Sequence, residues 1–449
     1  MSHVLYDMYA DRISRASTIK QFGKVTQVVG LVIESAGPAI SIGRLCHIEN
    51  HDGSRILAEV VGFRDDRLLL MPYGSIAGIN PGAIVTSTSD QLRIPVGPGL
   101  IGRVLGGLGQ PLDNKGPIAT GLTRPVSASP IPVLRRRRIT EPIRTGIKAI
   151  DTMATVGKGQ RMGIFAGSGV GKSVMLGMIA RNSSADVNVI ALVGERGREV
   201  KEFIERDLGD EGLKRSIVVA VSSDQPALIR IKGAMVATAI AEYFREQGKD
   251  VLLLMDSVTR VAIAQREIGL AIGEPPATKG YTPSVFALLP SLLERAGSDE
   301  HGSITGLYAV LVEADDFNEP ISDAVRSILD GHIALSRRLA SLNQYPAVDC
   351  LDSISRLMNE VSTDEEVRLA GEVREIMSTY TEAEDLINIG AYVKGSNPRI
   401  DRAIEKIGPI RQLFRQGIYE QCDHPATIAE LSVILNGVTS GGQKVQVSA

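Results

Sequence analysis

The spacing of apolar residues divides the chain into stretches with different periods. Residues 1–20 scatter apolar side chains among charged ones, which predicts an approximate amphipathic helix whose apolar face needs a partner. Residues 21–95 change to short β-branched runs separated by Gly, Asp, Asn and Pro turn clusters, and these runs lie at 25–33, 55–63 and 67–71. This alternation predicts a small β-barrel domain with its boundary near residue 95.

Residues 96–362 combine apolar runs of strand length with helical patterns. The runs lie at 163–166, 187–193, 216–221, 251–255 and 308–312. Alternation of this kind predicts an α/β domain with a parallel sheet and helices on both faces. Residues 363–449 are almost wholly helical in pattern, interrupted around Gly390, Gly395 and Pro398, which predicts a helical C-terminal domain.

Charge and hydropathy limit the possible partners. With 49 basic and 52 acidic residues the formal net charge is -3, which gives no general attraction to nucleic acid or to an anionic membrane. The run 135–138 holds arginines without interleaved aromatic residues, which favours a solvated loop or an interface strip over a nucleic-acid site. No apolar stretch reaches the roughly 20 residues of a membrane span, and the amino terminus lacks a signal-peptide core. We therefore expect a cytoplasmic protein without nucleic acid as a partner.

The cysteines indicate a reducing compartment. Cys46, Cys350 and Cys422 are far apart in the sequence, and none stands in a CxxC or zinc-like array. Cys422 and His424 could be two metal ligands, but nothing nearby completes a set of four. We therefore expect no metal at this pair.

The strongest chemical signal is a glycine-rich turn between a predicted strand and a predicted helix, in QRMGIFAGSGVGKSVMLGMIA. Its glycines let the backbone approach an anion closely, and the helix that starts near Lys172 adds its positive dipole end. Lys172 would bridge the β- and γ-phosphates of ATP, and the Ser173 hydroxyl would bind Mg²⁺ directly. The expected nucleotide-binding residues of this turn are Gly167, Ser168, Gly169, Val170, Gly171, Lys172, Ser173 and Val174.

One position departs from the phosphate-loop pattern GxxxxGK[ST], because Ala166 stands in place of the first glycine. A methyl group at the end of the strand is a mild change, since the three wrapping glycines remain. The competing interpretation is a chance glycine turn, which the flanking strand and helix disfavour.

Two carboxylates at strand ends complete the predicted site. The run VLLLMDS delivers Asp256 at the end of a buried strand, where it would hold the magnesium shell through water. In ALVGERGREVKEF a second strand ends at Glu195, and we expect this strand to lie beside the phosphate strand. There Glu195 would orient and deprotonate the attacking water as a general base. The alternative is a solvated helix start, since acidic residues favour first turns.

Several further sequence blocks narrow the class of protein more than the phosphate loop alone does. In chain order they are GSGVGKS, GERGREV, MDSVTR, GEPPATKGYTPSVF, LLERAG, DGHIALSR, YPAVDCLDSISR and NIGAYVKGSNPRIDRAI. With these blocks the chain resembles, from about residue 23 to about residue 416, the type III export ATPase family and, more distantly, the catalytic β subunit of rotary ATP synthases. The block NIGAYVKGSNPRID is similar to the flagellar branch more than to the injectisome branch.

The resemblance implies a β-barrel, a RecA-like parallel-sheet P-loop core and a helical C-terminal domain, assembled as a homohexameric ring with nucleotide at the subunit interfaces. It implies that Glu195 is the catalytic carboxylate, Arg196 a neighbouring interface arginine and Glu199 a residue near the water shell of the metal. Arg356 matches an arginine finger that reaches into the adjacent subunit's site, and Tyr345 matches a position near the adenine base.

Two of these residues keep plain structural alternatives. Arg356 could form a surface ion pair with Asp352 one turn back, a weak interaction that would need no catalytic role. Tyr345 could be a core aromatic.

The leading hypothesis is a flagellar type III export ATPase that uses ATP and Mg²⁺ to promote chaperone release and substrate export. The resemblance implies four kinds of partner: a stator-like regulator at residues 1–20, a central stalk protein, export gate membrane proteins and chaperone–substrate complexes. It also implies peripheral association with the inner-membrane export apparatus. The alternatives are an injectisome ATPase, a rotary ATPase catalytic subunit, a non-catalytic ring subunit and an RNA translocase. The last is disfavoured because residues 23–95 offer only Phe63 and Tyr73 for stacking on RNA.

Overall fold

The computed structural model describes residues 22–50, 53–88, 90–312, 316 and 319–437. The predicted amphipathic helix at 1–20 lies outside these residues. The chain divides into two compact units, Met1–Leu92 with Ile268–Pro275 and Arg93–Glu267 with Pro276–Ala449. The border between them falls three residues before the expected position near 95. Within the part of the chain that the structure describes, no helix is both long and apolar enough to traverse a bilayer.

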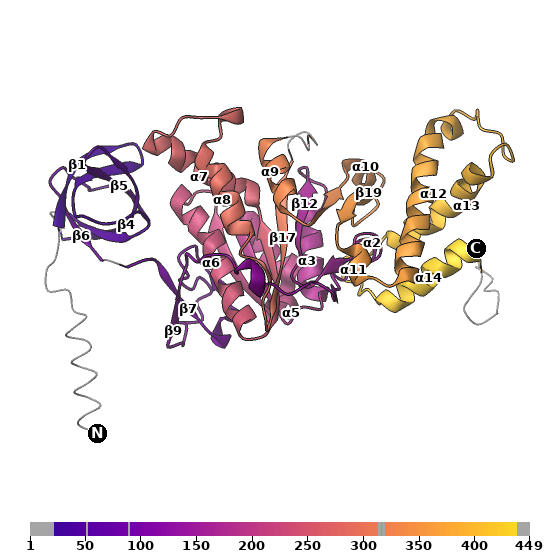
Figure 1. Cartoon of the computed structure of the whole chain (residues 1–449), viewed down its shortest axis with the longest axis horizontal. Helices are drawn as coiled ribbons and strands as arrows, with labels where there is room; N and C mark the ends of the chain where they lie inside the picture. The colour runs from indigo at the N-terminus through magenta and orange to yellow at the C-terminus, as the bar shows by residue number, and fades with distance from the viewer. Residues whose placement is uncertain (1–21, 51–52, 89, 313–315, 317–318, 438–449) are drawn as a thin grey trace, which may run out of the picture. The chain divides into compact units, whose positions relative to one another are not determined.

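The first unit contains a closed barrel of antiparallel strands in the order β1-β2-β5-β4-β3-β6 (Figure 1). The strands are β1 (Phe22–Val29), β2 (Val32–Ala36), β3 (Leu45–Glu49), β4 (Arg55–Arg64), β5 (Arg67–Pro72) and β6 (Ile84–Ser87). Alternate residues of these strands, among them Val25, Ile48 and Leu70, point inward and form a separate apolar core. The run 25–33, predicted as one strand, is a hairpin because the chain turns at Gly30, whose φ is 57°.

The second unit is built on one large sheet in the order β19-β18-β12-β17-β15-β13-β14-β8, with β16 added to β17. Its strands are β8 (Val104–Leu105), β12 (Arg161–Ala166), β13 (Val187–Glu195), β14 (Ser216–Ser222), β15 (Asp250–Asp256), β16 (Gly297–Ser298), β17 (Ser303–Leu311), β18 (Gly331–Leu335) and β19 (Val348–Ser355). All its pairings are parallel except those of β16 and β19. Two-stranded sheets join β7 (Arg93–Val96) to β9 (Leu122–Pro125) and β10 (Pro142–Ile143) to β11 (Val156–Gly157).

Helices cover both faces of this sheet, as the alternating pattern predicted. The helices are α2 (Lys148–Met153), α3 (Lys172–Asn182), α4 (Gly197–Glu202), α5 (Gly209–Leu213), α6 (Ala227–Glu246), α7 (Val258–Ile272), α8 (Pro283–Leu293), α9 (Pro320–Ile328), α10 (Arg337–Ser341) and α11 (Met358–Val361). Ile190, Leu192 and Leu254 share one apolar cluster with α3, whereas α6 packs against β13, β14 and β15. Burial on both faces explains why these strands are nearly continuous apolar runs.

The C-terminal region consists of α12 (Asp364–Asn388), α13 (Pro398–Phe414) and α14 (His424–Asn436), as the helical pattern predicted. Each helix begins at a side-chain cap, provided by Thr363, Asn397 and Asp423 respectively. Their apolar faces join the cluster that fills the α3 side of the sheet, so these helices pack against the α/β core as part of one unit.

Glu366 ties the first turn of α12 to two other segments. Its carboxylate accepts a hydrogen bond from the Thr363 N–H at 2.7 Å, as in a capping box. It also pairs with Arg144 at 3.2 Å and contacts the ring of His424 at the start of α14. Burial opposes ionisation, but the hydrogen bonds from His424 and Thr363 and the charge of Arg144 outweigh it and lower the pKa of Glu366 to about 2.

We expect Glu366→Gln to destabilise the fold by about 2 kcal/mol at neutral pH, since it removes a buried charge with several donors. A carboxyl with a lowered pKa contributes stability above its unfolded pKa, near 4.5 here, and loses it as the pH falls toward 2. The difference in unfolding free energy between wild type and variant should therefore shrink below pH 4.5. Denaturant unfolding of wild type and variant at pH 7 and pH 3 measures this difference.

The matched control is Glu375→Gln on the same helix, whose side chain is 54% exposed and pairs with Arg399. We expect it to cost less than about 0.5 kcal/mol. An equal loss in both variants, or a Glu366→Gln loss that does not change with pH, would contradict this account of the helix junction.

Candidate active site

The site lies at the carboxyl edge of the sheet, where loops leave β12, β13 and β15. One expectation about this edge was wrong: β13 is not beside β12, because β17 and β15 lie between them. The Glu195 and Lys172 side chains nevertheless line one cavity. The carboxyl ends of all parallel strands open at the same edge, so adjacency in the sheet is not required.

The glycine-rich loop turns the chain from β12 into α3. Gly169 and Gly171 have φ values of 79° and 87°, in the left-handed region that favours glycine. Helix α3 begins at Lys172, and its first N–H groups have no intrahelical acceptor and can bind an anion. Ala166, the departure from the motif, ends β12 with its methyl group packed in the core, where only 1% of the residue is exposed. The core thus accommodates the methyl group, although Ala166 also borders the cavity that Glu195 and Lys172 line.

Lys172 and Asp256 form a buried ion pair that links the start of α3 to the end of β15. Their side chains are only 10% and 5% exposed, respectively. Two opposite charges out of water need each other, because either one alone would bear a large desolvation cost. The pair therefore fixes the ammonium group of Lys172 at the mouth of the phosphate loop.

Glu195 ends β13 after an irregularity at Gly194, whose φ is 73°. A Cβ atom at Gly194 would lie 2.8 Å from Cδ of Arg260, so the absent side chain lets Arg260 pack closely. The Arg260 Nε lies 3.4 Å from the Glu195 carboxylate. Burial and the nearby negative charge of Asp256 raise the pKa of Glu195 to about 7, although Lys172 and Arg260 oppose the shift. A carboxyl with this pKa can accept a proton near neutral pH.

One cavity of about 570 Å³ brings most of the predicted residues together. The predicted residues that line it are Gly167, Ser168, Gly169, Gly171, Lys172, Ser173, Val174, Glu195, Arg196 and Glu199. Val170 is buried beneath the loop, and Asp256 reaches the site through its ion pair with Lys172. Arg196 and Glu199 form an exposed ion pair at 3.2 Å on the rim.

Arg356 lies elsewhere, just after β19 and outside the residues that line this cavity. Its side chain is exposed and forms no ion pair within the part of the chain that the structure describes, so the pairing with Asp352 is wrong. Asp352 belongs to the extended strand β19 and is not one helical turn away. Arg356 is therefore a guanidinium on the surface that can serve a site on another molecule.

Tyr345 lies next to the phosphate loop. A Cβ atom at Gly171 would lie 3.3 Å from the Tyr345 ring, and the residue is 40% exposed, which excludes the core interpretation. The ring lines a second cavity of about 380 Å³ that shares Gly169, Gly171 and Val174 with the first. Its other walls include Met178 and Pro346, so it is mainly apolar.

The sequence interpretation missed three arginines of the main cavity, Arg206, Arg260 and Arg337. Arg260 stands one helical turn after Asp256 in the block MDSVTR, and Arg337 ends the block DGHIALSR. Both blocks were used as whole motifs, so the arginines in them were assigned no role. Arg260 could have been found because it is a basic residue within one turn of a strand-end carboxylate.

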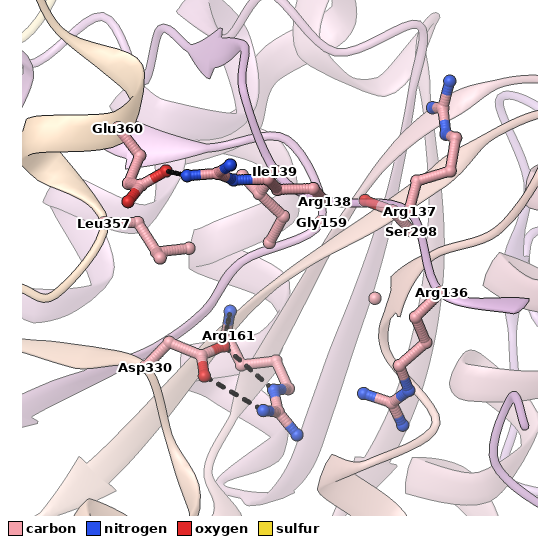
Figure 2. Close-up of a pocket in the computed structure, with 11 residues that line it drawn as sticks. Arg136, Arg137, Arg138, Ile139, Gly159, Arg161, Ser298, Asp330, Leu357 and Glu360 are labelled. Carbon is pink, nitrogen blue, oxygen red and sulfur yellow. Dashed lines mark hydrogen bonds and ion pairs between the residues drawn. The ribbon is translucent and has the colours of Figure 1, made fainter. Parts of the chain in front are cut away.

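The arginine run at 135–138 lies in a different place, around a cavity of about 340 Å³ near the amino end of β12 (Figure 2). Three of its members have acidic partners, namely Asp299 for Arg135, Glu294 for Arg136 and Glu360 for Arg138. Arg161 on the floor of this cavity forms two hydrogen bonds with Asp330, drawn as dashed lines in Figure 2. A run so extensively neutralised gives little attraction to a nucleic-acid backbone.

The main cavity can hold a triphosphate against a water molecule. Backbone donors and one lysine face the position of the terminal phosphates, and a carboxyl with a pKa near 7 faces the same space. This combination on a parallel sheet defines the class as a P-loop nucleoside triphosphate hydrolase.

Comparisons with known proteins identify the family. The family models that match are "ATP synthase alpha/beta family, beta-barrel domain" over 25–89, "ATP synthase alpha/beta family, nucleotide-binding domain" over 146–355 and "T3SS EscN ATPase C-terminal domain" over 362–433. The chain is 57% identical over 433 residues to the flagellum-specific ATP synthase of Bacillus subtilis, covering 96% of this chain and 98% of the relative. It is 50% identical over 398 residues to the type 3 secretion system ATPase of Xanthomonas euvesicatoria, covering 88% and 90%.

A solved structure matches over nearly the same length. The assembled ATPase EscN from the enteropathogenic E. coli type III secretion system superposes with a TM-score of 0.87 at 45% identity, covering 92% of this chain and 100% of that chain. The chain therefore belongs to the ATP synthase alpha/beta family and, within it, to the flagellar and type III secretion ATPases. It is an ATPase, and the resemblance stated from the sequence is confirmed.

The raised pKa of Glu195 can be tested without turnover. A carboxyl whose folded pKa is raised destabilises the fold when ionised, so the cost is absent below the unfolded pKa of 4.5 and complete above about pH 7. We expect nucleotide-free Glu195→Gln to be more stable than wild type by about 2 kcal/mol at pH 8. The gain should disappear as the pH falls toward 4.5 in denaturant unfolding.

Glu199→Gln is the matched control, because its side chain lines the same cavity but is 45% exposed. We expect its stability to differ from wild type by less than about 0.5 kcal/mol at both pH values. A Glu195→Gln variant that is less stable than wild type at pH 8 would refute the buried, raised-pKa state of this carboxyl.

Proposed function

We propose that this ATPase hydrolyses MgATP at the subunit interfaces of a homohexameric ring and serves a type III protein export apparatus, of the flagellar kind. The observation that carries the proposal is the position of Glu195, between the Lys172–Asp256 pair and Arg260 in the phosphate-loop cavity. The alternative is an injectisome ATPase, since relatives with both names share about half of the sequence or more. We also propose that the chain has three domains, a β-barrel at residues 21–95, an ATPase domain at 96–362 and a helical domain at 363–449.

Each catalytic side chain has its own task in hydrolysis. Lys172 and the loop N–H groups bind the β- and γ-phosphates, and Glu195 accepts a proton from the attacking water. The water oxygen bonds to the γ-phosphorus while the bond from that phosphorus to the β–γ bridging oxygen breaks, so ADP and phosphate leave. Arg260 keeps Glu195 oriented, and Arg196 and Glu199 on the rim contribute the interface arginine and a contact to the water shell of the metal.

Magnesium fits the donors that are present. Mg²⁺ usually binds one or two protein oxygens and completes its shell with phosphate oxygens and water. The exposed Ser173 hydroxyl would be the direct ligand, and Asp256 and Glu199 would hold metal-bound water. Among the described residues no group of three His, Cys, Asp or Glu side chains is close enough to hold a metal alone. The ion would supply charge neutralisation of the triphosphate, and the protein would supply its position.

The apolar cavity at Tyr345 suits the adenine base. It adjoins the phosphate loop through Gly169, Gly171 and Val174, so one nucleotide can extend from one cavity into the other. The Tyr345 face can stack on a purine, and Met178 and Pro346 can exclude water from its other side.

Arg356 acts in trans in this proposal. It is exposed and remote from its own chain's cavity, so it can reach a phosphate only in a neighbouring copy. Hydrolysis would then depend on ring assembly, because the transition state receives its last positive charge from the next subunit. The assembled state of EscN supports this arrangement.

Further partners belong to the same proposal. A structure of EscN in complex with its central stalk EscO supports a stalk protein for this chain. Residues 1–20 would bind a stator-like regulator, and the ring would meet chaperone–substrate complexes and export gate membrane proteins from the cytoplasmic side. Deletion of residues 1–18 followed by a pull-down tests whether this segment binds the regulator. Unchanged binding would refute that role of the segment.

We expect Glu195→Gln to lower kcat by about a thousandfold or more while the ring still binds nucleotide, because only proton acceptance is lost. We expect the same loss for Arg356→Ala. Phosphate production and fluorescent-nucleotide binding measure the two effects. Lys172→Ala should lose both turnover and tight nucleotide binding, and its unaltered turnover would refute the mechanism.

Mixing the two inactive variants tests the trans arrangement. In mixed rings, a subunit with intact Glu195 can stand next to one with intact Arg356, so about a quarter of the interfaces should regain all groups. Activity should therefore appear in a mixture of Glu195→Gln and Arg356→Ala. In the control experiment Arg338→Ala is used in place of Arg356→Ala. We expect the Arg338→Ala protein to hydrolyse ATP without any second variant. No recovery in mixed rings would refute Arg356 in trans.

A further inference from the structure

A cavity of about 360 Å³ adjoins the active site through Arg260. We call it the α7–α9 cavity, because residues of both helices line it. Arg260 and Leu311 belong to its wall and also to the wall of the active-site cavity. The two cavities are therefore neighbours that share part of their lining.

The cavity is lined by cations. Arg260, Arg266 and Lys279 face it, and Glu319 is the one acidic residue among the described residues that line it. Lys279 is 57% exposed and lies 3.8 Å from Asp316, too far for a strong ion pair. A concave space with this excess of positive charge attracts anions.

Among the described residues, Arg266 has no acidic partner. It is half-buried and stacks on the ring of Tyr281, with its guanidinium carbon 5.2 Å from the ring centre. Within the described chain it forms neither an ion pair nor a hydrogen bond. The ring attracts a cation but satisfies none of its N–H donors, so these remain for an anion in the cavity.

The start of α9 adds to this preference. Glu319 is the N-cap residue of α9 but its side chain makes no capping hydrogen bond, and Pro320 is the first helical residue, so the N-terminal turn of the helix lies at the wall of the cavity. Helix N-termini favour anions because their N–H groups are unpaired and the dipole is positive there. Arginine donors and helix donors together form the kind of surroundings that hold a phosphate.

We propose that the α7–α9 cavity binds inorganic phosphate, the product of hydrolysis, on its way out of the active site. Its volume accommodates phosphate with several waters, since a water occupies about 30 Å³ in the liquid. In this proposal the anion passes from one cavity to the other along Arg260 and Leu311, which line both. The inference rests on the proposed function only for the origin of the phosphate, because binding itself needs no turnover.

The experiment measures binding of radiolabelled inorganic phosphate to the assembled protein, with the active site filled by a non-hydrolysable ATP analogue and Mg²⁺. The analogue occupies the γ-phosphate position, so any saturable phosphate binds elsewhere. We expect saturable binding in the millimolar range that weakens with salt, and about tenfold weaker binding in Arg266→Gln. Lys279→Gln should weaken it by a smaller factor, because that side chain is more exposed.

Arg411→Gln is the matched control, since Arg411 also stacks on a tyrosine, Tyr380, at 5.0 Å, but lies on α13 and lines none of these cavities. It should bind phosphate like wild type. If Arg266→Gln does not fold, Arg266→Lys and Lys279→Gln replace it, with binding largely kept in the first and weakened in the second. Absence of saturable binding, or binding equal in wild type and all variants, overturns the proposal.

Lys172→Ala separates this inference from the proposed function. It should lose turnover but keep phosphate binding that depends on Arg266, because it alters only the first cavity. Turnover without such binding would refute the α7–α9 site alone, whereas binding without turnover in wild type would refute the hydrolytic role alone.

Discussion

The buried ion pair between Lys172 and Asp256 is the constraint on which the site depends. It joins the first residue of α3 to the last residue of β15, so the phosphate loop cannot move independently of the sheet. Neither charge can remain buried without the other. The negative charge of Asp256 also raises the pKa of Glu195, which makes that carboxyl a proton acceptor near neutral pH. One pair therefore fixes the phosphate loop and tunes the base.

The sequence predicted the parts of this arrangement that local patterns control. Near-continuous apolar runs identified β13 and β15, and the residues that follow such runs must lie at the carboxyl edge. Asp256 and Glu195 were found in this way, and Lys172 was found from the glycine-rich turn before it. Strand order could not be predicted, because it depends on contacts between distant segments, and the position of β13 was wrong for that reason. β18 and β19 were missed because one is short and the other carries exposed aspartates at the sheet edge.

Side chains that act through distant partners were the hardest to find. Arg260 comes from α7, packs over Gly194 and reaches Glu195, two contacts that no sequence period encodes. The arginines at 135–138 were expected to form a solvated loop or an interface strip, and acidic partners more than a hundred residues away neutralise most of them. Within the described part of the chain Arg266 and Arg356 form no ion pair, and their sequence context does not differ from that of paired arginines. Only the folded chain shows which charges are already neutralised.

From Lys172 through Arg260 to Arg266, the positive charge of each side chain is less completely neutralised by acidic side chains. Lys172 is paired in the interior with Asp256, Arg260 is paired at 3.4 Å with Glu195, and Arg266 has no acidic partner among the described residues. An anion released at Lys172 therefore meets groups that are progressively freer to bind it. When Glu195 carries the proton taken from water, its hold on Arg260 weakens, because a neutral carboxyl attracts a guanidinium less strongly. The proton transferred during hydrolysis would thus loosen a side chain that lines both cavities, at the step when phosphate must leave.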